Sequence, residues 1–296
     1  MDAERQDTPH EVIDLIAESL MPGRRDVLRR IFNAHGARAP LIIWTPVVEE
    51  LQSPLMRRFA EVCRSFADES GQVRDDTFSL EALGPIAAWM MIVEPEGDEF
   101  RYTHYGAGIA EHYGRDMTGE TTHSFSTHIG QFFKALYRAA AERREWVLSE
   151  HEPPARIFVR SWRRLIVPLM DADGETVLRF AVANFPENEL RAGLELITDP
   201  VFVLAEDHRV QYANRAAQRM FGFDTMQAHD AELTKLCGVE VDTPASPEDM
   251  LSQGRVDDSL RLSLRGGIAE RLVVTVSAAE HRGTAFYVVV MRQIGA

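Results

Sequence analysis

The stretch LITDPVFVLAEDHRVQYANRAAQRMFGFD, residues 196–224, decides how the C-terminal part of the chain folds. Two short apolar runs, residues 201–205 and 210–213, flank a polar turn, and this pattern predicts a β-hairpin. Asn214 lies just before an expected helix, where its side-chain oxygen can accept a hydrogen bond from the first free amides of that helix. Gly222 stands where that helix should end in the left-handed conformation. The stretch therefore predicts a hairpin that leads directly into a short capped helix.

The end of this hairpin and the helix after it resemble the opening of a PAS domain, in the form Y-A-N-x-A-A-x-x-M-F-G. The resemblance implies the α+β class, with a five-stranded antiparallel sheet and flanking helices. It also implies a sensory module rather than an enzyme. The residues that carry it are Tyr212, Ala213, Asn214, Ala216, Ala217, Phe221 and Gly222.

The region before this stretch has the same order of expected elements: two strands, short helices, a long helix and three strands. Tyr113 and Gly114 match Phe221 and Gly222 at an offset of 108 residues, which argues for duplication of a domain. The first copy is expected to have strands over residues 85–93, 100–104, 146–151, 157–169 and 176–183, and a long helix over 127–143. The second is expected to have strands over residues 201–205, 210–213, 260–265, 272–276 and 285–291, and a later helix from Ser246.

The first copy resembles a PAS variant that carries Gly-Arg-Asp-Met-Thr-Gly after its first helix, here residues 114–119. It departs from the second copy in having Tyr105 and Gly106 where the second has Ala213 and Asn214. The resemblance implies a bacterial sensory protein, of a kind found ahead of nucleotide cyclases and other output domains. The expected organisation is an N-terminal helical extension (1–78), a first PAS-like domain (79–185), a linker helix (186–198) and a second PAS domain (199–296).

Composition limits the class of protein. A formal net charge of −14 over 296 residues argues against binding to DNA or to an anionic membrane, because phosphates would be repelled. Cys63 and Cys237 make no disulfide framework, and no apolar run approaches the roughly 20 residues that span a bilayer. The chain does not start with a basic head and an apolar core, so we expect no signal peptide and a cytoplasmic protein.

The linker helix is expected to connect the two copies. Leu190, Leu194 and Ile197 follow one another at i, i+4 and i+7, which makes one apolar stripe. In PAS proteins such helices pair across a dimer, and the alternative is a helix folded onto its own sheet. We expect a homodimer. Its output would pass through a separate effector protein, or through a longer polypeptide of which this chain is a segment.

A bound ligand is expected between the inner face of each sheet and the helices that cross it, because apolar volume and a few polar groups meet there. All the candidates are large apolar or aromatic residues, and each is equally compatible with an ordinary core position. In the first copy they are Trp89, Met91, Phe132, Phe133 and Tyr137; in the second, Phe202, Leu204, Met220, Phe221 and Phe286.

A haem or metal sensor is the alternative function. His123 and His128 precede the long helix, where some PAS domains place a haem ligand, and a neutral imidazole binds iron well. Their spacing of five residues and the polar stretch around them favour capping or surface roles instead. The cofactor therefore stays unknown.

A basic cluster lies on one expected strand. Either it binds an anionic ligand or partner, or it forms a solvated face paired with the abundant acids. No flavin-photoreceptor motif, phosphate loop or nucleophile elbow occurs, so no enzyme is expected. The cluster consists of Arg156, Arg160, Arg163 and Arg164.

Overall fold

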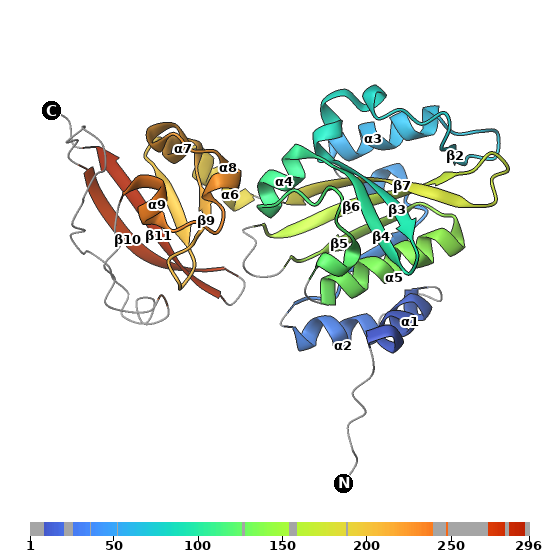
Figure 1. Ribbon diagram of the computed structural model, residues 1–296, viewed down its shortest axis with the longest axis horizontal. Coiled ribbons are helices and arrows are strands. Elements are labelled where there is room, and N and C mark those ends of the chain that lie inside the picture. Colours follow the sequence, from blue (N-terminus) through green and yellow to red (C-terminus); the bar gives the residue numbers. More distant parts are fainter. Residues whose placement is uncertain are drawn as a thin grey trace, which may run out of the picture. The chain divides into compact units, whose positions relative to one another are not determined.

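The computed structural model describes residues 9–20, 26–35, 37–51, 53–125, 128–153, 159–187, 189–238, 247, 272–281 and 284–293. The chain forms two compact units, each a sheet with helices packed on it (Figure 1). Unit 1 comprises Met1–Ala110, Asp116–Pro153 and Arg160–Glu187, and unit 2 comprises Glu111–Arg115, Pro154–Val159 and Asn188–Ala296. Within the described ranges, no helix is both long and apolar enough to cross a bilayer.

Unit 1 contains a seven-stranded sheet with the order β1-β5-β6-β7-β3-β4, and β2 pairs in parallel with the end of β6. The expected sheet had five strands; β1 adds an edge strand beside β5, and β2 adds the parallel pair. Both added strands come from the expected helical extension. The strands are β1 Leu41–Trp44, β2 Val73–Arg74, β3 Met90–Glu96, β4 Glu99–Tyr105, β5 Val147–His151, β6 Ser161–Met170 and β7 Val177–Glu187.

The expected strand over residues 85–93 is only partly correct. Its first half lies in the 3-10 segment η2, Glu81–Trp89, and β3 begins at Met90. Pro85 has no amide hydrogen to give to a ladder, and Gly84 turns the chain with a φ of 53°. From Met90 onward the expected hairpin is confirmed, because Glu96 and Glu99 pair across a two-residue turn.

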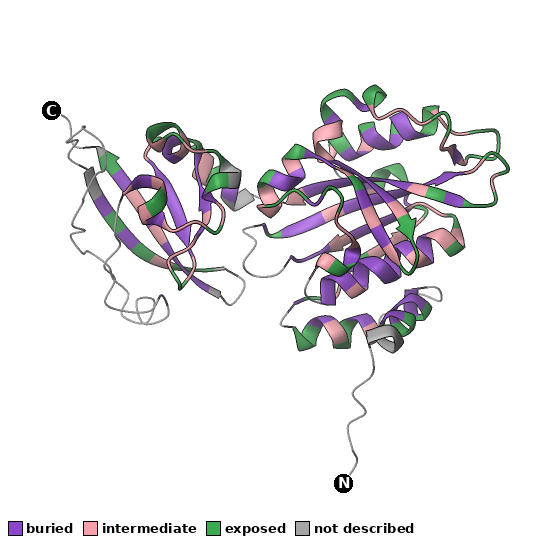
Figure 2. Ribbon diagram, in the orientation of Figure 1, coloured by how far each residue is buried: buried purple, intermediate pink, exposed green. Residues whose placement is uncertain are grey.

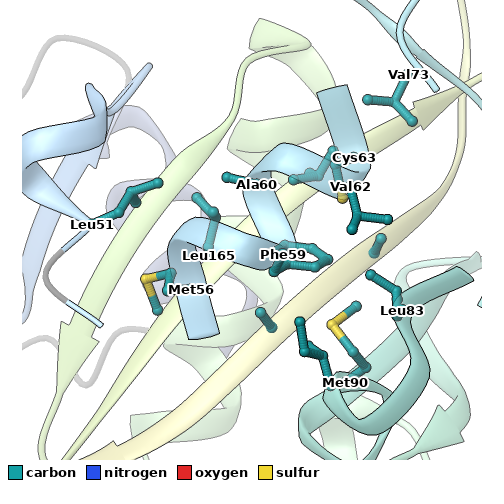
Figure 3. Close-up of a cluster of buried hydrophobic side chains, with 14 of the residues drawn as sticks. Leu51, Met56, Phe59, Ala60, Val62, Cys63, Val73, Leu83, Met90 and Leu165 are labelled. Atoms are coloured by element: carbon teal, nitrogen blue, oxygen red, sulfur yellow. The ribbon is translucent and has the colours of Figure 1, made fainter. Parts of the chain in front are cut away.

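Helices cover both faces of this sheet (Figure 1). On one face α3, Pro54–Ser65, and η2 bury Met56, Phe59 and Cys63 against Leu165 and its neighbours (Figure 3). On the other face lies α5, His128–Arg143, with α1, Pro9–Leu20, and α2, Asp26–Ala34, packed on its far side. The central strands are therefore buried on both faces (Figure 2). The remaining short segments of unit 1 are η1, Val48–Glu50, and η3, Thr122–Ser124.

Unit 2 contains a four-stranded antiparallel sheet with the order β10-β11-β8-β9. Its α7, α8 and α9 pack on one face, where Phe202, Ala217 and Val289 share a core. The strand expected over 260–265 and the helix expected from Ser246 lie outside the described residues, apart from Pro247. The elements are α6 Glu189–Glu195, β8 Val201–Leu204, β9 Val210–Ala213, α7 Arg215–Phe221, α8 Thr225–Ala228, α9 Leu233–Cys237, β10 Leu272–His281 and β11 Thr284–Gln293.

The two units share a strand order and a helix position. The path β6-β7-β3-β4 in unit 1 corresponds to β10-β11-β8-β9 in unit 2. After β4 comes α4, Ala107–Tyr113, and after β9 comes α7, with both helix ends offset by 108 residues. Each helix is followed by a left-handed glycine, Gly114 with a φ of 86° and Gly222 with a φ of 73°. The chain is thus α+β, with two largely antiparallel sheets and flanking helices.

Candidate functional site

A row of three buried polar side chains crosses the middle of the unit 1 sheet. Ser149 of β5 lies directly opposite Arg164 of β6, and Arg164 lies directly opposite Asn184 of β7. Residues directly opposite each other in a ladder point to the same face, so the three side chains form one line. We call Ser149, Arg164 and Asn184 the polar row.

The polar row faces α5. Leu165 and Ala183, the neighbours of Arg164 and Asn184 in the chain, belong to the core on the α3 face. Because side chains alternate along a strand, the polar row points to the opposite face. Phe133 and Tyr137 of α5 contact Arg164 there: the Arg164 Cζ lies 3.8 Å from the Phe133 ring centroid, and Nη1 lies 3.5 Å from the Tyr137 hydroxyl.

The polar row is almost completely removed from solvent. The exposed fraction is 0% for Ser149 and 3% for both Arg164 and Asn184. Three of its atoms, Ser149 Oγ, Arg164 Nε and Asn184 Oδ1, have no hydrogen-bond partner among the described residues. Buried polar groups nearly always have hydrogen-bond partners in folded proteins, so three unpartnered atoms in one line need a physical explanation.

Two other cations of unit 1, Lys134 and Arg163, have acidic partners. The ammonium group of Lys134, on the same helix as Phe133, lies 2.6 Å from Glu99. Arg163, the neighbour of Arg164, lies 2.7 Å from Glu150 on the other side of β6. Arg164 makes no ion pair with any described residue. The expected ion pairing with acids is therefore correct for Arg163, whose side chain is only 13% exposed, and it does not apply to Arg164.

Two phenols lie close to the polar row. Burial raises the pKa of Tyr137, and the guanidinium of Arg164 opposes that shift. Burial and then the neighbouring Tyr137 raise the pKa of Tyr102 well above its usual value, again with Arg164 opposing. Both phenols therefore stay neutral at physiological pH. They can form hydrogen bonds, but they supply no negative charge to Arg164.

The structure brings four of the five unit 1 candidates to the α5 side. Phe132, Phe133 and Tyr137 lie on α5 itself, and Met91 lies opposite Val182 on the sheet face turned toward it. Trp89 is the exception, because it packs against Phe185 in the core on the α3 face.

The unit 2 candidates are divided between two faces. Phe202 and Leu204 lie in the core under α7, and the ring of Phe221 lies 6.0 Å from that of Phe202. Phe286 points to the opposite face, and Met220 is 37% exposed on the surface. The two faces of β11 are both apolar, so alternation along this strand did not indicate which side turns inward.

The two histidines expected as weak haem candidates lie apart from the polar row. His123 is exposed in η3. His128 is buried, with its ring stacked on His35 at 4.2 Å and against Phe32 of α2 at 4.6 Å. Burial and then His35 lower the pKa of His128 to about 4, so its imidazole is neutral. Packing between α5 and α2 accounts for the buried position of His128.

The side chain of Asn214 joins the elements at the start of unit 2 by hydrogen bonds. Its Oδ1 accepts hydrogen bonds from the amides of Ala217 and Val201, both at 3.0 Å, so it caps α7 as expected and also anchors β8. Its Nδ2 donates to the carbonyls of Leu194, Ile197 and Asp199. A single buried side chain therefore joins the linker, the first strand and the first helix of this unit.

The linker helix α6 lies on its own sheet. Leu194 packs against Val203, Tyr212 and Phe286 on the face away from α7. The Tyr212 hydroxyl donates to Glu195 at 2.8 Å. The alternative of a helix folded onto its own sheet is thus correct for Leu194, while Leu196 remains 84% exposed and Ile197 39% exposed.

Comparisons with known proteins identify the fold around Asn214. The family model described as the PAS fold matches residues 188–232, the segment from α6 to the residue before α9. No curated protein matches the chain.

Among solved structures, the PAS domain of nitrogen regulation protein NR(II) from Vibrio parahaemolyticus is 21% identical, with a TM-score of 0.30, over 36% of this chain and 99% of that one. A PAS domain from a two-component sensor histidine kinase is 17% identical, with a TM-score of 0.29, over 35% and 92%. The sensory domain of the Campylobacter jejuni chemoreceptor Tlp3 is 8% identical, with a TM-score of 0.27, over 96% and 91%.

Proposed function

We propose that this chain, whose C-terminal unit contains a PAS domain, is a cytoplasmic sensory protein of bacterial type with two PAS units in series. The observation that carries the proposal is the family match over residues 188–232, in a unit whose strand order recurs in unit 1. The 108-residue offset between α4 and α7 supports an origin by duplication. The role is that of a sensor rather than an enzyme.

In this proposal unit 1 binds a small molecule and unit 2 passes the signal on. The polar row supports ligand binding in unit 1, because its buried orphan atoms need a partner that the described residues do not supply. Asn214 supports a relay in unit 2, because one side chain couples α6 to β8 and α7. A ligand produces a signal only if it favours one arrangement of these elements over another.

The output requires a second polypeptide chain. We propose a homodimer in which the exposed Leu196 and Ile197 at the end of α6 meet their counterparts, and an effector, such as a nucleotide cyclase, that reads the dimer. Apolar side chains that remain exposed next to the packed Leu194 are suited to an interface between two copies of the chain. Leu194 is already used within its own unit, so it takes no part in this interface.

Native mass spectrometry of the full chain tests the dimer. We expect a dimer for the natural chain and a monomer for the double variant Leu196→Glu, Ile197→Glu. Leu178→Glu is the control, because Leu178, on β7 of unit 1, is about as exposed as Ile197, at 44% against 39%, and its variant should remain a dimer. A natural chain that is monomeric at tens of micromolar would refute relay through a dimer. Equal dissociation by the control would refute the assignment of the interface.

A further inference from the structure

The polar row places a positive charge in a region with no described counter-ion. A buried ion is costly unless it is paired, and proteins normally supply the partner. Arg164 has only a neutral phenol at 3.5 Å and an aromatic ring at 3.8 Å as described contacts. The ring face attracts the guanidinium, but it offers no acceptor to the Nε–H group, which has none among the described residues.

We propose that the polar row is a binding site for a small hydroxylated monocarboxylate, with Arg164 as its counter-ion. The ligand would bind on the α5 face of β5, β6 and β7, beside the Phe133 ring that covers the Arg164 guanidinium. This inference names the ligand class of unit 1 and so deepens the function proposed above.

Charge balance favours a monocarboxylate. One guanidinium neutralises one carboxylate, whereas a phosphate dianion would leave a net negative charge in a buried site whose other groups are neutral. The planar fork of an arginine also fits the two oxygens of a carboxylate. Chloride balances the charge but cannot use that fork.

The remaining members of the row favour a hydroxyl group on the ligand. Asn184 presents an unpartnered Oδ1, which needs a donor, and Ser149 presents a hydroxyl that can donate or accept. A ligand hydroxyl can donate to one and accept from the other. An ammonium group would fit less well, because no described carboxylate lies on this row to balance it.

The neighbouring rings suit the carbon atoms of such a ligand. Phe133 covers Arg164 from α5, and Tyr137 lies beside it on the next turn of the same helix. Phe133 also contacts the ring of His151, 4.9 Å away. Polar groups on the sheet and aromatic groups on the helix are the arrangement that small-molecule sites use to orient a ligand.

Isothermal titration calorimetry on the full chain tests the proposal with lactate, glycolate and 3-hydroxybutyrate as probes. We expect saturable binding of at least one of them, and none of lactamide, which lacks the charge. Arg164→Gln should weaken that binding about ten-fold or more, because a charge-assisted contact is lost. Arg163→Gln removes the same charge at the adjacent position, but on the other side of β6, and should keep the affinity within about two-fold.

A second variant separates binding from folding. Arg164→Met removes a charge that has no described counter-ion, so its urea midpoint should match or exceed that of the unliganded natural chain, while binding is lost. A clearly lower midpoint together with unchanged binding would assign Arg164 a structural role and overturn the proposal.

Small molecules released by denaturing the protein purified from its own host provide an independent test. A hydroxylated carboxylate released by the natural chain and Arg163→Gln, but not by Arg164→Gln, supports the site. Tight binding of chloride or phosphate with no binding of the three acids overturns it. So does the absence of both binding and a released carboxylate. Binding that leaves the dimer unchanged would refute the relay proposed above and leave this site standing.

Discussion

Replacing Asn214 by alanine should selectively unfold unit 2. The alanine removes the cap of α7, which costs about 1 kcal/mol. It also leaves the buried amide of Val201 without an acceptor, at about 1–3 kcal/mol. The carbonyls of Ile197 and Asp199 lie in residues that are not fully buried, so water can replace their donor at little cost. The expected loss is on the order of 2–4 kcal/mol.

Because of where the tryptophans lie, the stability of each unit can be measured separately. All four tryptophans, Trp44, Trp89, Trp146 and Trp162, lie in unit 1. In urea, tryptophan fluorescence therefore follows unit 1, while hydrogen exchange of peptides from β8 and α7 follows unit 2. With a urea slope of about 2 kcal/mol per molar, the unit 2 midpoint should fall by about 1–2 M. The fluorescence midpoint should not change.

Arg219→Ala is the control for this experiment. Arg219 is exposed on the same helix, α7, so its variant should change stability by no more than about 0.5 kcal/mol. If Asn214→Ala lowers the unit 2 midpoint no more than Arg219→Ala does, Asn214 does not hold the linker, strand and helix together. The coupling of α6 to the sheet would then need another explanation.

Three further variants test unit 1 by urea unfolding with tryptophan fluorescence. His128 has a pKa near 4 in the folded chain and 6.5 as its ordinary value, so stability should be full above pH 6.5 and fall by on the order of 2–3 kcal/mol toward pH 4. His128→Phe should flatten that dependence; an unchanged slope would contradict the assignment. Gly106→Ala should cost about 1–3 kcal/mol, because a Cβ would collide with a backbone carbonyl of η2; a neutral result would show that η2 can move. Phe59→Ala should cost about 3–5 kcal/mol, and Leu55→Ala, exposed on the same helix, much less; similar losses would contradict the packing of α3.

Local signals predicted the parts of the fold that depend on local geometry. The cap at Asn214 and the left-handed Gly222 are confirmed, because each is determined by the few residues around one helix end. The long helix of unit 1 and the hairpin after Met90 are confirmed for the same reason. Gly106 is explained by a contact with Ala88 of η2 rather than by a local signal, since the position that Asn214 occupies in unit 2 has no room for a side chain in unit 1.

Contacts between distant residues were not predictable in this way. Strand β1 joins the sheet through β5, more than 100 residues later, and no local pattern indicates that pairing. The inward face of a strand could not be assigned where both faces are apolar, as for Phe286 on β11, which lies on the face away from α7. Trp89 lies in η2, before β3 begins, and packs on the α3 face.

The polar row depends both on local signals and on contacts between distant residues. Its members come from three strands and meet only through the register of the ladder. The available signal was a polar residue inside each apolar strand, as with Asn184 in FAVANF, together with the adjacent pair Arg163 and Arg164. Alternation along a strand sends adjacent residues to opposite faces, so one of two neighbouring arginines must point inward.

The adjacency of Arg163 and Arg164 also bears on how β6 finds its place during folding. Since β6 is buried on both faces, a slip by one residue would still bury apolar side chains, and it would still place a guanidinium inside. The hydrophobic pattern alone therefore favours the native register of β6 only weakly over a register shifted by one residue. The pairing of Arg163 with Glu150 and Glu187 favours the native alignment over the slip that turns Arg163 to the α5 face, because in that slip Arg163 loses both acids. An ion pair on the α3 face of β6 thus helps to set the register of the side chains on the α5 face.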